Sequence, residues 1–140
     1  MLTTIETIYT PDLTILCECP VPFDKISAGF PSDVCDQIEK YLDINEHLVK
    51  NPVSTFFMRA AGDSMIDAGI FPRDILIVDK SIDTVDKHVV IAIVNEEFTV
   101  KRYRSVDGNS YLVDEKESGL TIKYKAFEIW GVVTASIHAL

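Results

Sequence analysis

Short segments that favour β-strands, separated by turn residues, dominate the sequence from about residue 54 onward. They are rich in β-branched and aromatic residues and cover 54–60, 74–79, 88–94, 97–103, 110–113 and 128–137. Asn95-Glu96 separates two of them and Asp107-Gly108-Asn109 separates two more, which is typical of hairpin connections. The sequence therefore predicts a mainly β body of antiparallel strands.

The beginning of the chain has a different character. Prolines interrupt it repeatedly, at Pro11, Pro20, Pro22 and Pro31. Because proline lacks a backbone donor and disfavours helix interiors, this spacing predicts an extended arm. Residues 3–10 and 14–17 are rich in β-favouring side chains, so the arm can also pack as an edge strand.

Two short helices are predicted between the arm and the strands. The first spans 32–42, behind a Ser32 or Asp33 cap, with apolar residues at three- and four-residue spacing: Val34, Cys35, Ile38, Tyr41 and Leu42. The second begins at an Asp43 cap, runs through Leu48 and is stopped by Asn51-Pro52.

Composition limits the classes of function that fit. A chain of 140 residues with 47% hydrophobic content predicts one soluble domain. Its net charge of -9 opposes the phosphate backbone, so direct DNA binding is not expected. The apolar run at 89–94 is far shorter than the roughly 20 residues of a membrane helix, and no leader is recognisable, so we expect a cytoplasmic protein without a membrane anchor.

Cysteine and histidine do not suggest a metal site. Cys17 and Cys19 are too close for an ordinary disulfide framework, and Cys35 leaves an odd number, which favours reduced thiols. The histidines, at positions 47, 88 and 138, lack the spacing of zinc ligands. No metal and no other cofactor is therefore expected.

Ser64 is the first candidate for chemistry. It lies in Ala61-Gly62-Asp63-Ser64-Met65, between a predicted strand and a short turn, where a serine hydroxyl can be exposed as a nucleophile. Backbone N–H groups at such a bend, here those of Asp63 and Ser64, can stabilise an oxyanion. The local sequence is equally compatible with Ser64 as the N-cap of a helical turn.

A serine nucleophile needs a base, and the sequence leaves the choice open. His88 and His47 would allow a serine-histidine pair, with Asp63 or Asp67 as orienting groups. Lys101 ends the alternating run 97–101 and shares a strand face with Thr99 and Tyr103. A lysine acts as a base only if burial lowers its pKa, and the alternative is an exposed lysine beside Arg102.

Joined motifs resemble the family of UmuD- and LexA-type self-cleaving proteins. The residues concerned are TFFMRAAGDSMIDAGI at 55–70, DILIVD at 74–79, and VVIA with EFTVK at 89–92 and 97–101. The similarity extends from about Ala28 to the segment 129–137. The resemblance implies a LexA/UmuD-like peptidase domain of antiparallel strands with short helices and an extended N-terminal arm.

The resemblance also implies the chemistry. The family's Ser/Lys dyad maps onto Ser64 as nucleophile and Lys101 as general base, which makes the chain an autoproteolytic serine endopeptidase. The cut would fall between Ala28 and Gly29, because the family cleaves between a small residue and glycine. It would remove an arm of residues 1–28 and leave a domain of residues 29–140. Two departures are His88, where the family commonly has an acidic residue, and Ala28, where some relatives have cysteine.

Partners follow from the same resemblance. UmuD-like chains form homodimers that, once shortened, join a Y-family (UmuC-like) subunit of an error-prone translesion DNA polymerase in the SOS response, and a RecA filament stimulates cleavage. A non-catalytic interaction module remains an alternative. A repressor needs more than 28 residues for its DNA-binding domain. A signal-peptidase relative would need a membrane anchor.

Overall fold

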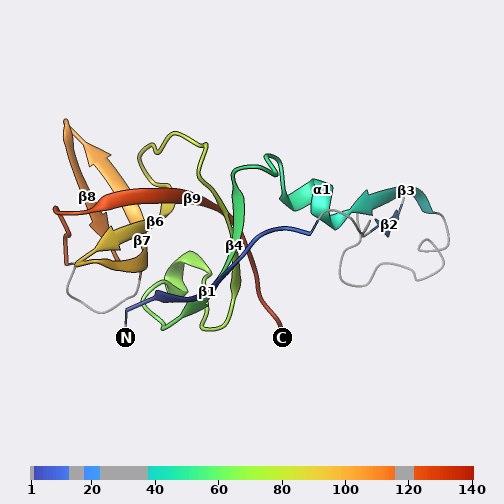
Figure 1. Ribbon diagram of the computed structural model, residues 1–140, viewed down its shortest axis with the longest axis horizontal. Coiled ribbons are helices and arrows are strands. Elements are labelled where there is room, and N and C mark those ends of the chain that lie inside the picture. Colours follow the sequence, from blue (N-terminus) through green and yellow to red (C-terminus); the bar gives the residue numbers. More distant parts are fainter. Residues whose placement is uncertain (1, 13–17, 23–37, 116–121) are drawn as a thin grey trace. The chain divides into compact units, whose positions relative to one another are not determined.

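The computed structural model describes residues 2–12, 18–22, 38–115 and 122–140 (Figure 1). The chain divides into two compact units, one of Met1–Thr10 with Asn51–Leu140 and one of Pro11–Lys50. None of the helices in the described ranges is both long and apolar enough to cross a membrane.

The unit Pro11–Lys50 contains a two-stranded antiparallel sheet and one helical turn. β2 (Glu18–Pro22) pairs with β3 (Ile38–Asp43), and α1 (Ile44–Leu48) follows directly. The Asp43 side chain accepts a hydrogen bond from the backbone N–H of Asn45, as predicted for the cap of this helix.

The helix expected over 32–42 is wrong for its described part. Residues 38–42 belong to β3, whose backbone groups bond to β2 instead of to each other. Ile38 and Tyr41 favour strands as readily as helices, so a pairing partner decides the outcome. Residues 32–37 lie outside the described ranges.

The larger unit is a strand barrel. Its elements are β1 (Thr4–Tyr9), β4 (Thr55–Ala61), β5 (Ile75–Asp79), β6 (Val89–Val94), β7 (Glu97–Val106), β8 (Asn109–Val113) and β9 (Glu128–Ile137). The strand order is β1-β4-β5-β9-β6-β7-β8, and a further pairing of β1 with β7 closes the ring and leaves β8 outside it. All of these pairings are antiparallel, which confirms the mainly β expectation.

Both expected hairpin connections are present. Asn95 and Glu96 have φ angles of 50° and 66°, and Asp107 and Gly108 have φ angles of 50° and 78°. Two successive residues with positive φ form the turn type that matches the right-handed twist of paired strands. The second turn brings Val106 opposite Asn109, so it fixes the register of β7 and β8.

The first strand belongs to the barrel although it lies in the expected arm. β1 pairs with β4, from Thr4 opposite Ala61 to Tyr9 opposite Phe57. Ile5 packs against a buried cluster that includes Met58, Ala60 and Met65. The expectation that residues 3–10 pack as a strand is therefore confirmed, but β1 pairs with β4 and with β7 and is not an edge strand. The cluster includes Met65 and so anchors the turn that follows β4.

Candidate functional site

Ser64 lies in the turn between β4 and the 3-10 helix η2 (Ile66–Ala68) and is 6% exposed. The residue at the cap position of η2 is Met65, and no side chain caps that helix. Ser64 is therefore not an N-cap. The strand-to-helix bend predicted for the nucleophile is present, and Gly62, with φ of 88°, begins it in a conformation that glycine adopts without strain.

The Ser64 hydroxyl forms two hydrogen bonds with a residue from the start of the chain. The backbone N–H of Thr3 donates to Ser64 Oγ at 2.8 Å, and Ser64 Oγ donates to Thr3 Oγ1 at 3.0 Å. Thr3 is completely buried. The side chain that the sequence predicts as a nucleophile is thus covered by the segment that leads into β1.

Lys101 is buried on β7, with an exposed fraction of 1%, and it shares a face with its register partner Val90, opposite to Val100. Its Nζ forms an ion pair with Asp114 and lies 4.5 Å from the centre of the Tyr124 ring. Burial and the nearby Asp114 carboxylate raise the pKa of Tyr124, so its phenol is neutral at physiological pH.

The neighbours of Lys101 on β7 point the other way. Arg102 bonds to Glu115 at 2.8 Å and Arg104 bonds to Asp86 at 2.9 Å, and both arginines are about a quarter to a third exposed. Alternation along the strand thus separates the buried amine from the solvated guanidinium groups. The alternative of an exposed Lys101 beside the arginines is wrong.

Two sets of contacts bring the surroundings of Ser64 and Lys101 together. Asp67 N donates to Glu115 O at 2.8 Å, which ties the Ser64 turn to the residue after Asp114. Thr3 O, next to the N–H that binds Ser64, accepts from Val100 N and from Thr99 Oγ1, each at 3.0 Å. Ser64 and Lys101 are both described residues, and they are not hydrogen-bonded to each other; each is held by a different partner.

The other predicted residues have separate outcomes. His88 Nδ1 accepts from Val85 N at 3.2 Å, and His47 lies on α1 in the smaller unit. The role of the Asp63 and Ser64 N–H groups toward an oxyanion stays a prediction. Ala28 and Gly29 lie outside the described residues.

Sequence reasoning did not find three residues of the site, Thr3, Asp114 and Tyr124. Asp114 is 13 positions from Lys101 and Thr3 is 61 positions from Ser64. Hairpin pairing of β7 with β8 was predicted and carries Asp114 back toward Lys101, so this pairing is the only signal that pointed to it. No local pattern pairs Thr3 with the Ser64 turn.

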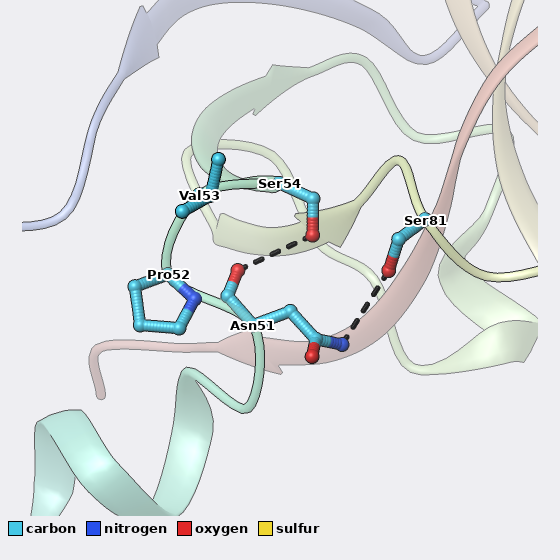
Figure 2. Close-up of a pocket in the computed structure, with 5 residues that line it drawn as sticks. All are labelled: Asn51, Pro52, Val53, Ser54 and Ser81. Carbon is cyan, nitrogen blue, oxygen red and sulfur yellow. Dashed lines mark hydrogen bonds between the residues drawn. The ribbon is translucent and has the colours of Figure 1, made fainter.

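A surface cavity of about 330 Å³ lies at the opposite end of β4, lined by Asn51, Pro52, Val53, Ser54 and Ser81 (Figure 2). Beneath it Asp79 accepts hydrogen bonds from Asn51 and Ser54 at 2.7 Å each and from Ser81 N at 2.8 Å. Burial opposes ionisation of Asp79, but these hydrogen bonds outweigh it and lower its pKa from 3.8 to about 2. The cavity is lined by a turn that these hydrogen bonds stabilise, and its lining contains no pair of nucleophile and base. We therefore do not assign it a catalytic role.

Comparison with known proteins places these residues in a family context. The family model described as Peptidase S24-like matches residues 20–134. Protein SamA of Salmonella typhimurium is 38% identical over 119 residues, which cover 85% of this chain and 84% of SamA. Protein ImpA of Escherichia coli is 39% identical over 121 residues, with coverage of 85% and 83%.

A more distant relative has the same domain within a longer chain. The LexA repressor of Clostridium kluyveri is 30% identical over 115 residues, which cover 82% of this chain and 56% of the repressor. The family match therefore spans the turn with Ser64, the strand with Lys101 and most of the barrel. The chain belongs to the Peptidase S24-like family of serine peptidases, as a UmuD-like member.

Proposed function

We propose that the chain cleaves its own Ala28–Gly29 bond, with Ser64 as nucleophile and Lys101 as general base. The observation that carries this proposal is the burial of both side chains, 6% exposed for Ser64 and 1% for Lys101, in a Peptidase S24-like domain in which Thr3 joins the Ser64 turn to the Lys101 strand. A lysine acts as a base only as a neutral amine, so Lys101 has to leave the Asp114 carboxylate before the reaction.

The reaction needs both side chains to leave their present partners. Lys101, as a neutral amine released from Asp114, accepts the Ser64 Oγ proton while Oγ, released from Thr3, attacks the Ala28 carbonyl carbon. The N–H groups of Asp63 and Ser64 would stabilise the oxyanion. The Lys101 ammonium then protonates the Gly29 nitrogen as the peptide bond breaks. Water hydrolyses the resulting Ala28 ester and frees Ser64.

The biological setting extends the proposal. The shortened chain, as a homodimer, would serve as accessory subunit to a Y-family (UmuC-like) polymerase in the SOS response to DNA damage, and a RecA filament would stimulate the cut. Support comes from the UmuD-like family and from the net charge of -9, which favours protein contacts over direct DNA binding.

A second candidate is a non-catalytic interaction module. One observation favours it: the Ser64 hydroxyl and the Lys101 amine are each occupied by another residue. In that case the dyad residues would serve only the packing of the barrel.

Intact-mass spectrometry distinguishes the two candidates. The purified protein is incubated at mildly alkaline pH, where more lysine is neutral, and separately at neutral pH with RecA filament on single-stranded DNA. If the chain cleaves itself, we expect two fragments, one of residues 1–28 that ends at Ala28 and one of residues 29–140 that begins at Gly29. A chain that stays intact under both conditions contradicts the proposal and favours the interaction module.

A further inference from the structure

The segment Leu2–Tyr9 passes over the turn that carries Ser64. Thr3 contacts both sides of the opening between β4 and β7: its N–H binds Ser64 Oγ after β4, and its carbonyl binds Val100 N on β7. Thr4 then pairs with Ala61 on one side and with Thr99 on the other. These are the contacts of an extended strand added between two sheet edges.

Gly62 shows how closely this strand is fitted. A Cβ atom added at Gly62 would lie 2.1 Å from the backbone oxygen of Leu2, an impossible approach. The absence of a side chain at Gly62 therefore lets the backbone of Leu2 pass directly over the turn that carries Ser64. Leu2 therefore contacts the Ser64 turn at Gly62, in addition to the hydrogen bonds that Thr3 forms with Ser64.

We propose that the groove between β4 and β7 at Ser64 is a strand-binding site for one extended peptide at a time, and that Leu2–Tyr9 is its resting occupant. The Ala28–Gly29 segment then reaches Ser64 only after this occupant has moved away. The protein is held latent by its own first strand. The effect on self-cleavage rests on the proposed function. Whether the groove holds only one peptide at a time can be measured without any cleavage.

The pairing of β1 with β4 is more extensive than its pairing with β7. The strand can therefore leave the groove by separating from β7 first. β1 pairs with β4 along its length, whereas its register with β7 consists of the single pair Thr4 and Thr99. The Thr3 end can therefore separate from β7 and Ser64 while the Tyr9 end stays paired with β4. Local fraying of a strand end requires far less free energy than global unfolding.

A reversible disulfide between β1 and β4 tests the exchange. Thr4 and Ala61 are register partners next to Thr3, so cysteines there satisfy the Cα spacing of a disulfide and hold the end of β1 that has to separate. The variant carries Thr4→Cys and Ala61→Cys, with Cys17, Cys19 and Cys35 replaced by serine. We expect oxidation to hold β1 in the groove and slow self-cleavage roughly 100-fold, because the open state is no longer populated, and reductant to restore the rate.

The matched control carries Thr4→Cys and Ala61→Ser in the same background, so that it meets the oxidant without forming this disulfide. Its cleavage rate should not respond to oxidation. Equal self-cleavage rates in the oxidised and reduced double-cysteine protein would overturn the inference. Failure of the two cysteines to form a disulfide would also overturn it.

A binding measurement separates this inference from the proposed function. Ser64→Ala is added to the double-cysteine protein, and a fluorescent peptide of residues 24–33 is titrated against the reduced and oxidised forms. We expect binding at least about tenfold tighter to the reduced form. Equal binding to both forms, or binding to neither, overturns the exclusive groove. If the peptide binds more tightly to the reduced form but the protein with Ser64 never cleaves itself, the strand-binding groove is supported and the proposed function is contradicted.

Discussion

At the scale of single residues, the two side chains of the proposed dyad are both buried and both engaged elsewhere. Ser64 is held by Thr3 and Lys101 by Asp114. Such partners satisfy buried polar groups that would otherwise cost free energy. In the proposed reaction these contacts would have to break before a proton could pass from serine to lysine, so they would set part of the barrier to cleavage.

Asp114 gives the first prediction. Replacing Asp114 with asparagine removes the negative charge that holds the Lys101 ammonium, so the amine turns toward Ser64 more readily. We expect self-cleavage about tenfold faster at neutral pH, since a hydrogen bond between charged groups contributes about 1.5 to 3 kcal/mol. The rate is followed by intact-mass spectrometry. Asp114→Glu keeps the charge and serves as the control, and an unchanged or slower rate for Asp114→Asn would contradict the prediction.

How far these residues could be predicted from the sequence differs between them. The motif around Ser64 is a local pattern, so the bend could be expected. Alternation places Thr99, Lys101 and Tyr103 on one strand face but does not say whether that face is buried, so the burial of Lys101 could not be predicted from it. Thr3 reaches Ser64 through barrel closure, a contact between distant parts of the chain. Sequence spacing has no signal for such a pairing, because many strand orders fit the same local pattern.

At the scale of elements, Asp79 at the end of β5 fixes the turn that leads into β4. It accepts hydrogen bonds from Asn51, Ser54 and Ser81, and its pKa is lowered from 3.8 to about 2. The folded state therefore binds a proton at Asp79 less readily than the unfolded state. Its stabilising effect is complete above pH 3.8 and is lost as the pH falls through about 2.

Asp79→Ala tests this linkage. We expect the free energy of unfolding at pH 7 to fall by about 2 to 3 kcal/mol, because the carboxylate and its hydrogen bonds are removed. The difference from the unsubstituted protein should shrink as the pH approaches 2. Urea unfolding at pH 7 and at low pH measures it. Asp83→Ala, at an exposed position two residues beyond Ser81, should change stability little; equal losses in both variants would contradict the account.

Elements were predictable where a turn or periodic pattern fixed them. The span of β9 and the hairpin at Asn95-Glu96 could be read from β-branched runs and turn residues. The helix expected over 32–42 failed over residues 38–42, because strand pairing with β2 overrides a helical spacing that is only about three turns long. Tertiary contacts decide such short segments.

At the scale of the whole molecule, the proposed cut would separate β1 from the rest of the barrel. Residues 1–28 include β1, which closes the ring between β4 and β7. After cleavage this strand stays only through non-covalent pairing. The cut would thus convert an intramolecular strand into a separate ligand of the groove, and its departure would leave two sheet edges free for a partner strand.

Hydrogen exchange at Val100 tests that consequence. Its N–H bonds to Thr3 O at 3.0 Å, so loss of the released fragment removes the acceptor. We expect the Val100 amide to exchange at least tenfold faster in the cleaved protein, whereas the amide of Ala60, which bonds to Asp74 O, changes little. Unchanged protection at Val100 after the fragment is removed would show that β1 does not close the barrel.

The most direct test of the central claim is the rate at which a chain beginning at Gly29 appears, compared among the unsubstituted protein, Ser64→Ala and Lys101→Ala. The account predicts that product in the unsubstituted protein, and a loss of at least about 1,000-fold in each variant while both remain folded. Cleavage at an undiminished rate in either folded variant would contradict the assignment of Ser64 and Lys101 as nucleophile and base.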